Sequence, residues 1–132
     1  GNCLQTFGLE GRKPLRVFVS PDGKSILTVS EGFKAEVWDF DTGCMRFGLD
    51  KRMTSSYVAA FSPGGRIAVT GNADKSLYAF DVYTGEKLAG IFTDYHTTVC
   101  TVGSDGKSMV AGDGKARLYF LELYSLSFPR LL

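Results

Sequence analysis

A four-residue turn pattern occurs three times in this sequence, and its spacing limits the possible folds more than any other feature. The copies begin at residues 20 (SPDG), 62 (SPGG) and 103 (GSDG), so the two steps are 42 and 41 residues. A second landmark keeps the same two steps: Trp38–Phe40 (WDF), Phe80–Val82 (FDV) and Leu121–Leu123 (LEL). Landmarks that share one period indicate a repeated structural unit of about 42 residues.

Each repeat is divided into four short apolar runs by turn residues placed about every ten positions. Short runs rich in β-branched and aromatic residues, bounded by Gly, Pro, Asn, Asp and Ser, are typical of antiparallel strands. We predict strands at 15–19, 25–30, 34–40 and 44–48 in the first repeat, 57–61, 66–70, 76–82 and 87–92 in the second, and 98–102, 107–111, 116–122 and 124–128 in the third. Residues 3–7 match the fourth strand of a repeat, and they predict one orphan strand before the first full unit.

Strand 76–82 carries apolar side chains on both of its faces. Leu77 and Ala79 point one way, whereas Tyr78, Phe80 and Val82 point the other. A sheet exposed on one side would alternate apolar and polar residues, so this sheet is expected to be covered on both sides. Stacked four-stranded units of this period are the blades of a β-propeller.

The predicted fold class is all-β, a partial β-propeller of about three four-stranded antiparallel blades plus the orphan strand. The repeat boundaries divide the chain into 1–14 (outer strand of a preceding blade and linker), 15–56 (blade), 57–97 (blade) and 98–132 (blade with an atypical end). Because three blades do not close a ring, the end blades should expose apolar faces. Self-association or the remaining blades of a larger propeller are expected to cover them.

The segment 68–81 resembles the WD-repeat family position by position, with Phe80 where a tryptophan usually stands, and Trp38-Asp39 is an intact WD dipeptide. The resemblance implies structural repeat positions at Trp38, Asp39, Asp74, Phe80 and Asp81. It also implies a rigid propeller that binds proteins or peptides, usually without catalysis. The family's blade-entry histidine has no counterpart here, and Lys115 replaces the turn aspartate of the third repeat. Packing is therefore expected to carry more of the stability than a polar network does.

Charge and composition narrow the function further. Lys plus Arg total 15 and Asp plus Glu total 14, a balance that makes a nucleic-acid partner unlikely because such proteins usually carry a basic excess. No apolar run reaches the roughly 20 residues that span a bilayer, so no membrane partner is expected. His96 is the single histidine, so a catalytic arrangement that needs a histidine could form at only one place, and no enzyme activity is expected.

Cys3, Cys44 and Cys100 lack the spacing of a metal site or a disulfide framework. We expect three reduced, mostly buried thiols in an intracellular protein, cytoplasmic or nuclear, that holds no metal and no cofactor.

Function is then expected on loops, because blade packing uses the strand residues. The repeat register places the loops that enter each first strand (9–13, 50–56, 93–97) and those that join the second strand to the third (31–33, 72–75, 113–115) on one face. Candidate partner-binding residues there are Phe33, Lys51, Arg52 and Tyr95. We predict a non-catalytic protein–protein interaction scaffold. The alternative is part of a non-WD, quinoprotein-like propeller enzyme whose active site lies on other blades.

Overall fold

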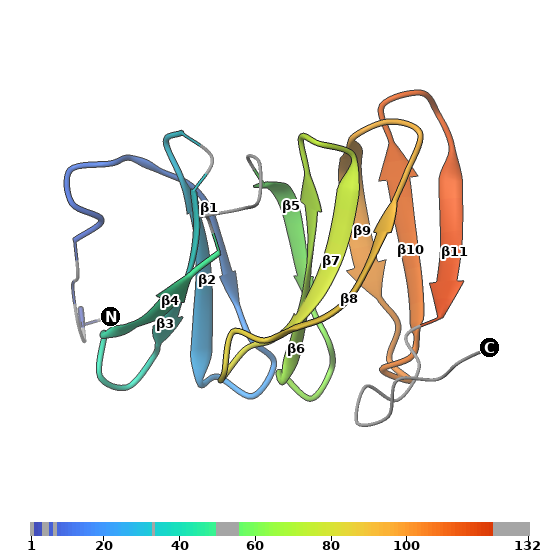
Figure 1. Ribbon diagram of the computed structural model, residues 1–132. Helices are drawn as coiled ribbons and strands as arrows, with labels where there is room; N and C mark the ends of the chain where they lie inside the picture. Colours follow the sequence, from blue (N-terminus) through green and yellow to red (C-terminus); the bar gives the residue numbers. More distant parts are fainter. Residues whose placement is uncertain (1, 4–5, 7, 33, 50–55, 123–132) are drawn as a thin grey trace.

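Three antiparallel sheets stand side by side in the computed structural model of the protein, which describes residues 2–3, 6, 8–32, 34–49 and 56–122 (Figure 1). The first sheet contains β1 (Pro14–Val19), β2 (Ser25–Ser30), β3 (Lys34–Asp39) and β4 (Met45–Gly48). The second contains β5 (Ser56–Phe61), β6 (Ile67–Asn72), β7 (Ser76–Asp81) and β8 (Lys87–Phe92). The third contains β9 (Thr97–Val102), β10 (Ser108–Asp113) and β11 (Leu118–Glu122).

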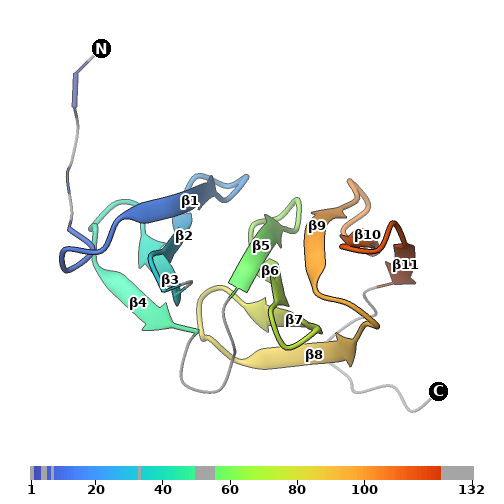
Figure 2. The same cartoon turned by 90° about the horizontal axis from the view of Figure 1, so that it is seen from above.

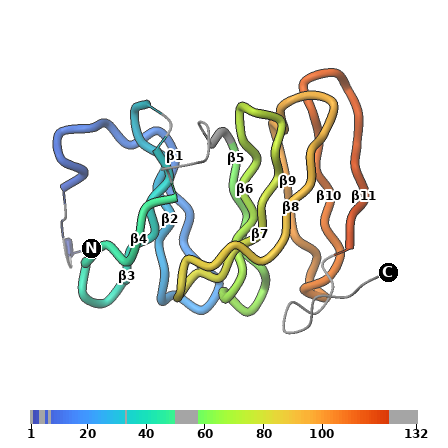
Figure 3. The backbone as a smooth tube through the Cα atoms, viewed as in Figure 1, coloured from blue at the N-terminus to red at the C-terminus, as the bar shows by residue number. Residues whose placement is uncertain are grey.

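The all-β prediction is confirmed, and within the described ranges the structure contains no helix. In each sheet, strands that follow one another in the chain are hydrogen-bonded neighbours, and the chain finishes one sheet before it enters the next (Figure 3). The predicted strands at 3–7 and 124–128 fall mostly or wholly outside the described residues. The third sheet accordingly has three strands within the described part of the chain.

The middle sheet is covered on both faces, as the apolar pattern of 76–82 predicts. On one side Phe80 and Val82 pack into a core with Leu27 and Val37 of the first sheet. On the other side, Leu77 shares a core with residues of the third sheet that include Met109 and Ala111. Seen from above, the first strands of the three sheets, β1, β5 and β9, lie along the same edge of the stack (Figure 2). These are stacked blades with one core between each neighbouring pair.

The repeated turn pattern joins the first strand of each sheet to the second. Its last residue has a positive φ in all three copies: 71° at Gly23, 73° at Gly65 and 69° at Gly106. Glycine takes this conformation without steric cost, which explains why it closes each copy. At Gly65 the backbone also approaches the neighbouring blade, because an added Cβ would lie 2.7 Å from Cγ of Asp22. The turn therefore also permits close contact between the first two blades.

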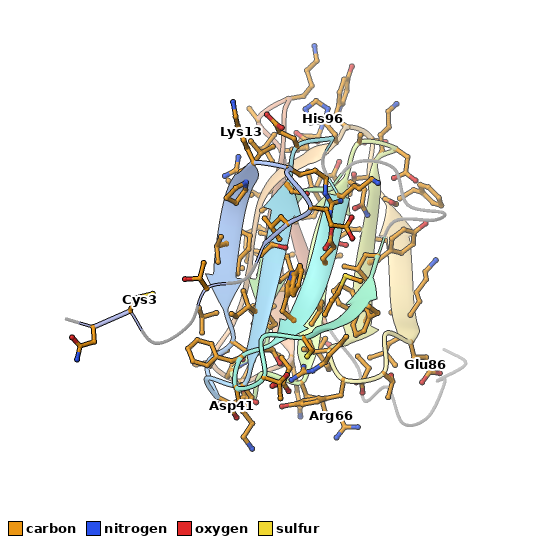
Figure 4. All side chains as sticks on the ribbon, turned by 90° about the vertical axis from the view of Figure 1, so that its left-hand side faces the viewer. Cys3, Lys13, Asp41, Arg66, Glu86 and His96 are labelled. Atoms are coloured by element: carbon orange, nitrogen blue, oxygen red, sulfur yellow. The ribbon has the colours of Figure 1, made fainter. Side chains whose placement is uncertain are left out.

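The turns and loops gather at two opposite ends of the stack (Figure 4). Lys13 and His96, which precede or begin first strands, lie at one end. Asp41, Arg66 and Glu86, which lie in the other two kinds of turn, are at the opposite end. We call the first end the loop face; it consists of the loops that enter first strands and the turns between second and third strands.

Candidate functional site

Tyr95 stands on the loop face at the junction of the second and third blades, in the loop that connects β8 to β9. Three cationic groups surround its ring. Nζ of Lys115 lies 5.1 Å from the ring centroid, Nζ of Lys75 lies 5.6 Å away, and Cζ of Arg117 lies 5.8 Å away. Lys75 comes from the β6–β7 turn, whereas Lys115 and Arg117 come from the segment between β10 and β11. Two blades thus present cations to one aromatic ring. Each cation is attracted to the ring electrostatically.

Hydrogen bonds fix the Tyr95 loop to the turns of both blades. The amide of Thr93 donates to the carbonyl oxygen of Lys75 at 2.8 Å, and the buried Thr93 hydroxyl lies 2.6 Å from the Tyr95 carbonyl oxygen. On the side of the third blade, the amide of Gly114 donates to the carbonyl oxygen of His96 at 3.3 Å. The ring of Tyr95 is therefore held on a loop whose two ends are anchored.

One ion pair and one buried carboxylate also lie near Tyr95. Asp94 forms an ion pair with Arg117, and its amide donates to the hydroxyl of Tyr119 at 3.3 Å. That hydroxyl donates in turn to Asp113 at 3.1 Å. Burial alone would raise the pKa of Asp113, but hydrogen bonds from the amides of Lys115 and Arg117 and from Tyr119 lower the pKa below its usual value. Asp113 thus stays ionised and orients the turn that carries Lys115. We call Lys75, Asp94, Tyr95, Lys115 and Arg117 the Tyr95 cluster.

The two turns that supply the lysines adopt an uncommon backbone conformation. Lys75 has φ 69° and Ala116 has φ 61°, in the left-handed region that non-glycine residues seldom occupy. Carboxylates hold both turns: Asp74 accepts from the amide of Ser76 at 2.9 Å, and Asp113 accepts from the amide of Lys115 at 2.8 Å. A strained backbone that its neighbours hold in place is frequent at functional sites.

Of the four partner-binding residues expected from the sequence, Tyr95 is the one that the structure describes. Phe33, Lys51 and Arg52 lie outside the described residues. The cations around Tyr95 were not singled out by sequence reasoning, although the repeat register places Lys75 and Lys115 in loops of the same face. Their convergence on one ring depends on the packing of two blades, which the register of a single blade does not reveal.

The structural repeat positions lie within and between the blades. Trp38 is buried and donates from Nε1 to Oγ1 of Thr28 at 2.9 Å, and Phe80 is buried between the first two blades. Asp39 and Asp81 cap the third-to-fourth strand turns: Asp39 accepts from the amide of Thr42 and Asp81 from the amide of Thr84, both at 3.0 Å.

The cysteines differ from the expectation of mostly buried thiols, which is wrong for two of the three. Cys3 and Cys44 are exposed, whereas Cys100 is partly buried, and no disulfide joins them. Cys44 immediately precedes the outer strand β4, whereas Cys100 lies on β9 and packs toward the second blade. Burial raises the pKa of Cys100 to about 12. Among the described residues, no group of three His, Cys, Asp or Glu side chains is arranged to hold a metal ion.

The described part of the chain contains no helix with the length and apolar character that a membrane crossing requires. No protein-family model matches the sequence. The meiotic recombination protein rec14 of Schizosaccharomyces pombe is 28% identical over 101 residues, which are 76% of this chain and 33% of that protein. The chain therefore spans about a third of the length of the curated relative that it matches.

Among solved structures, the Cps50 (Swd1) β-propeller domain of Myceliophteria thermophila matches with a TM-score of 0.78 and 11% sequence identity. The match covers 94% of this chain and 39% of that one. At this identity the likeness establishes the fold. The three stacked sheets and this match together show that the chain folds as blades of a β-propeller, the fold that the resemblance of its sequence implies.

Proposed function

We propose that the chain is a non-catalytic, intracellular interaction platform that binds a partner protein through its loop face, with the Tyr95 cluster at the centre of the contact. The observation that carries the proposal is the convergence of cations from two blades on one aromatic ring in an anchored loop. Tyr and Arg are enriched among residues that dominate protein interfaces. Loops on a rigid scaffold are also the usual carriers of binding function.

At the opposite end of the stack, Arg46 and Tyr83 are engaged in contacts within the protein, which supports the choice of the loop face. Arg46 forms an ion pair with Asp39 at 3.0 Å, donates to Oγ of Ser25 at 2.7 Å and lies 4.6 Å from the ring centroid of Tyr83. The hydroxyl of Tyr83 donates to Asp22 at 2.9 Å, which links the second blade to the first. These groups tie blades together, whereas Lys75 and Lys115 remain exposed on the loop face.

Site-specific photo-crosslinking tests the proposal. A benzophenone amino acid is placed at exposed positions of the loop face outside the Tyr95 cluster, Lys13 and Glu31, and at exposed positions of the opposite end, Asp41 and Lys107. The four variants are expressed in cells, irradiated and purified, and the adducts are identified by mass spectrometry. We expect the same partner to be crosslinked from both loop-face positions and not from the opposite end. Adducts obtained mainly from Asp41 and Lys107 would contradict the choice of face.

A further inference from the structure

We infer that the Tyr95 cluster recognises an acidic segment of the partner, by placing an Asp or Glu carboxylate of that segment against Lys75 and Lys115. The inference deepens the proposed function and rests on it, since it names the chemistry of the partner at the same site. It follows from three observations. The two lysines have no described counter-ion, both lie near the ring of Tyr95, and the neighbouring Arg117 is already paired with Asp94.

The two lysines are cations without a counter-ion in the described part of the protein. Both are exposed, and no described carboxylate lies within 4.0 Å of either ammonium group. Two arginines of the same face differ, because Arg12 is paired with Glu36 and Arg117 with Asp94. Lys75 and Lys115 are therefore available to an anion from outside.

The ring of Tyr95 brings these two charges together. Because both ammonium groups lie within 5.6 Å of the centroid of the same ring, an acidic segment that contacts Tyr95 comes near both lysines. The backbone of both turns is held by hydrogen bonds, so little ordering is required when the partner binds. The half-buried ring also offers an apolar surface on which the methylene groups of a Glu side chain can pack.

The neighbouring groups favour a carboxylate over a phosphate. Phosphate recognition relies strongly on the two-pronged guanidinium of arginine, and Arg117 is already engaged by Asp94. The side chain of Asp94 is 68% exposed, so its negative charge faces the same approach and repels a dianion more than a monoanion. A carboxylate is therefore the better electrostatic match for this cluster than a phosphate.

Fluorescence anisotropy with purified protein tests the inference. The probes are three fluorescein-labelled peptides of equal length in which Gly alternates with Glu, with Gln or with phosphoserine. We expect the Glu peptide to bind about tenfold more tightly than the Gln peptide, which corresponds to one charge-assisted contact. The variant with Lys75→Gln and Lys115→Gln should lose this preference. Raising the salt concentration should weaken the binding of the Glu peptide and leave the binding of the Gln peptide unchanged.

The matched control carries Lys24→Gln and Lys107→Gln, which remove two exposed lysines from the opposite end. It should bind the Glu peptide as the parent does, and circular dichroism checks that both variants fold. Equal binding of the Glu and Gln peptides, an equal loss in the control, or tightest binding of the phosphoserine peptide would each overturn the inference. If crosslinking maps the partner to the loop face and the Glu peptide shows no preference, the proposed function stands and the inference fails. If the Glu peptide binds preferentially but crosslinking maps the partner to the opposite end, the proposed function is wrong.

Discussion

The threonine on the second strand and the aromatic residue on the third change together from blade to blade. In the first blade Thr28 accepts a hydrogen bond from Trp38. In the second blade Thr70 and Phe80 occupy these positions, and because phenylalanine has no donor, the buried Thr70 hydroxyl has no partner among the described residues. In the third blade the step of 41 residues brings Ala111 to the threonine position. This polar pair is thus complete in the first blade and half present in the second, and in the third blade an apolar residue replaces the threonine.

Thr→Val substitutions, which keep the shape of the side chain, should therefore have different effects in the two blades. Thr28→Val removes the acceptor of the buried Trp38 donor and should lower the free energy of unfolding by about 1–3 kcal/mol. Thr70→Val removes a hydroxyl that is buried without a partner and should leave stability unchanged or raise it. Chemical denaturation of both variants beside the parent measures the difference. Equal destabilisation by the two substitutions would contradict this, because it would show that the Thr70 hydroxyl stabilises the fold.

Sequence reasoning at this scale succeeds where a residue's role is set within one blade and fails where it is set between blades. The turn roles of Asp39 and Asp81 follow from the repeat register, because each caps a turn only a few residues away. The exposure of Cys44 depends on whether another part of the protein covers the outer strand β4, which the repeat pattern does not specify. The cations around Tyr95 depend in the same way on two blades meeting.

Among the elements, two turns carry the clearest electrostatic signature: the third-to-fourth strand turn of the first blade and the first-to-second strand turn of the third blade. In the first blade, hydrogen bonds from the amide of Thr42 and from Arg46 lower the pKa of Asp39 from 3.8 to about 2. In the turn between β9 and β10, hydrogen bonds from Ser108 lower the pKa of Asp105 to about 2. Both carboxylates are ionised in the folded state at pH values where the unfolded chain has begun to bind protons.

The sign of the resulting pH dependence follows from that difference. A carboxylate with a lowered folded-state pKa stabilises the fold above the unfolded value of 3.8, and this contribution is lost as the pH falls toward 2. Asp39→Asn should therefore reduce the slope of unfolding free energy against pH between about pH 5 and about pH 2. Asp105 remains in the variant, so the slope should decrease without vanishing. Denaturant titrations at several pH values test this, and a slope unchanged from the parent would contradict the assigned role of Asp39.

The existence and order of the strands are predictable from the sequence. The residues at which each strand begins and ends are harder to predict. Turn residues at regular spacing separate the strands, and each predicted run within the described residues corresponds to an observed strand. The second strand of the second blade is predicted at 66–70 and observed at Ile67–Asn72. Gly71 and Asn72 look like turn residues in the sequence. Gly71 nevertheless lies in the strand. A glycine is required there because an added Cβ would lie 2.7 Å from Cβ of Thr97, which belongs to the next blade.

At the scale of the whole molecule, the two outer sheets have apolar faces that no described residue covers. On the first blade, Leu15, Val17 and Val19 alternate along β1 and point away from the second blade, and Val17 is 57% exposed. On the third blade, Val99, Leu118 and Phe120 form the outward face, and Phe120 is 77% exposed. The middle sheet shows how such faces are normally used, since both of its faces are buried against other sheets. We therefore expect another sheet, from a second copy or from further blades, to cover each end.

The central structural claim, that these are propeller blades with two faces built to pack against further blades, is tested most directly by the mass of the 132-residue chain in solution. Light scattering after size-exclusion chromatography should give a mass above the 14.4 kDa of one chain, and the mass should rise with concentration. Phe120→Glu, which places a charge on the open face of the third blade, should lower that mass while the β-sheet circular dichroism is retained. A sharp peak at 14.4 kDa at all concentrations, with cooperative two-state unfolding, would contradict the claim.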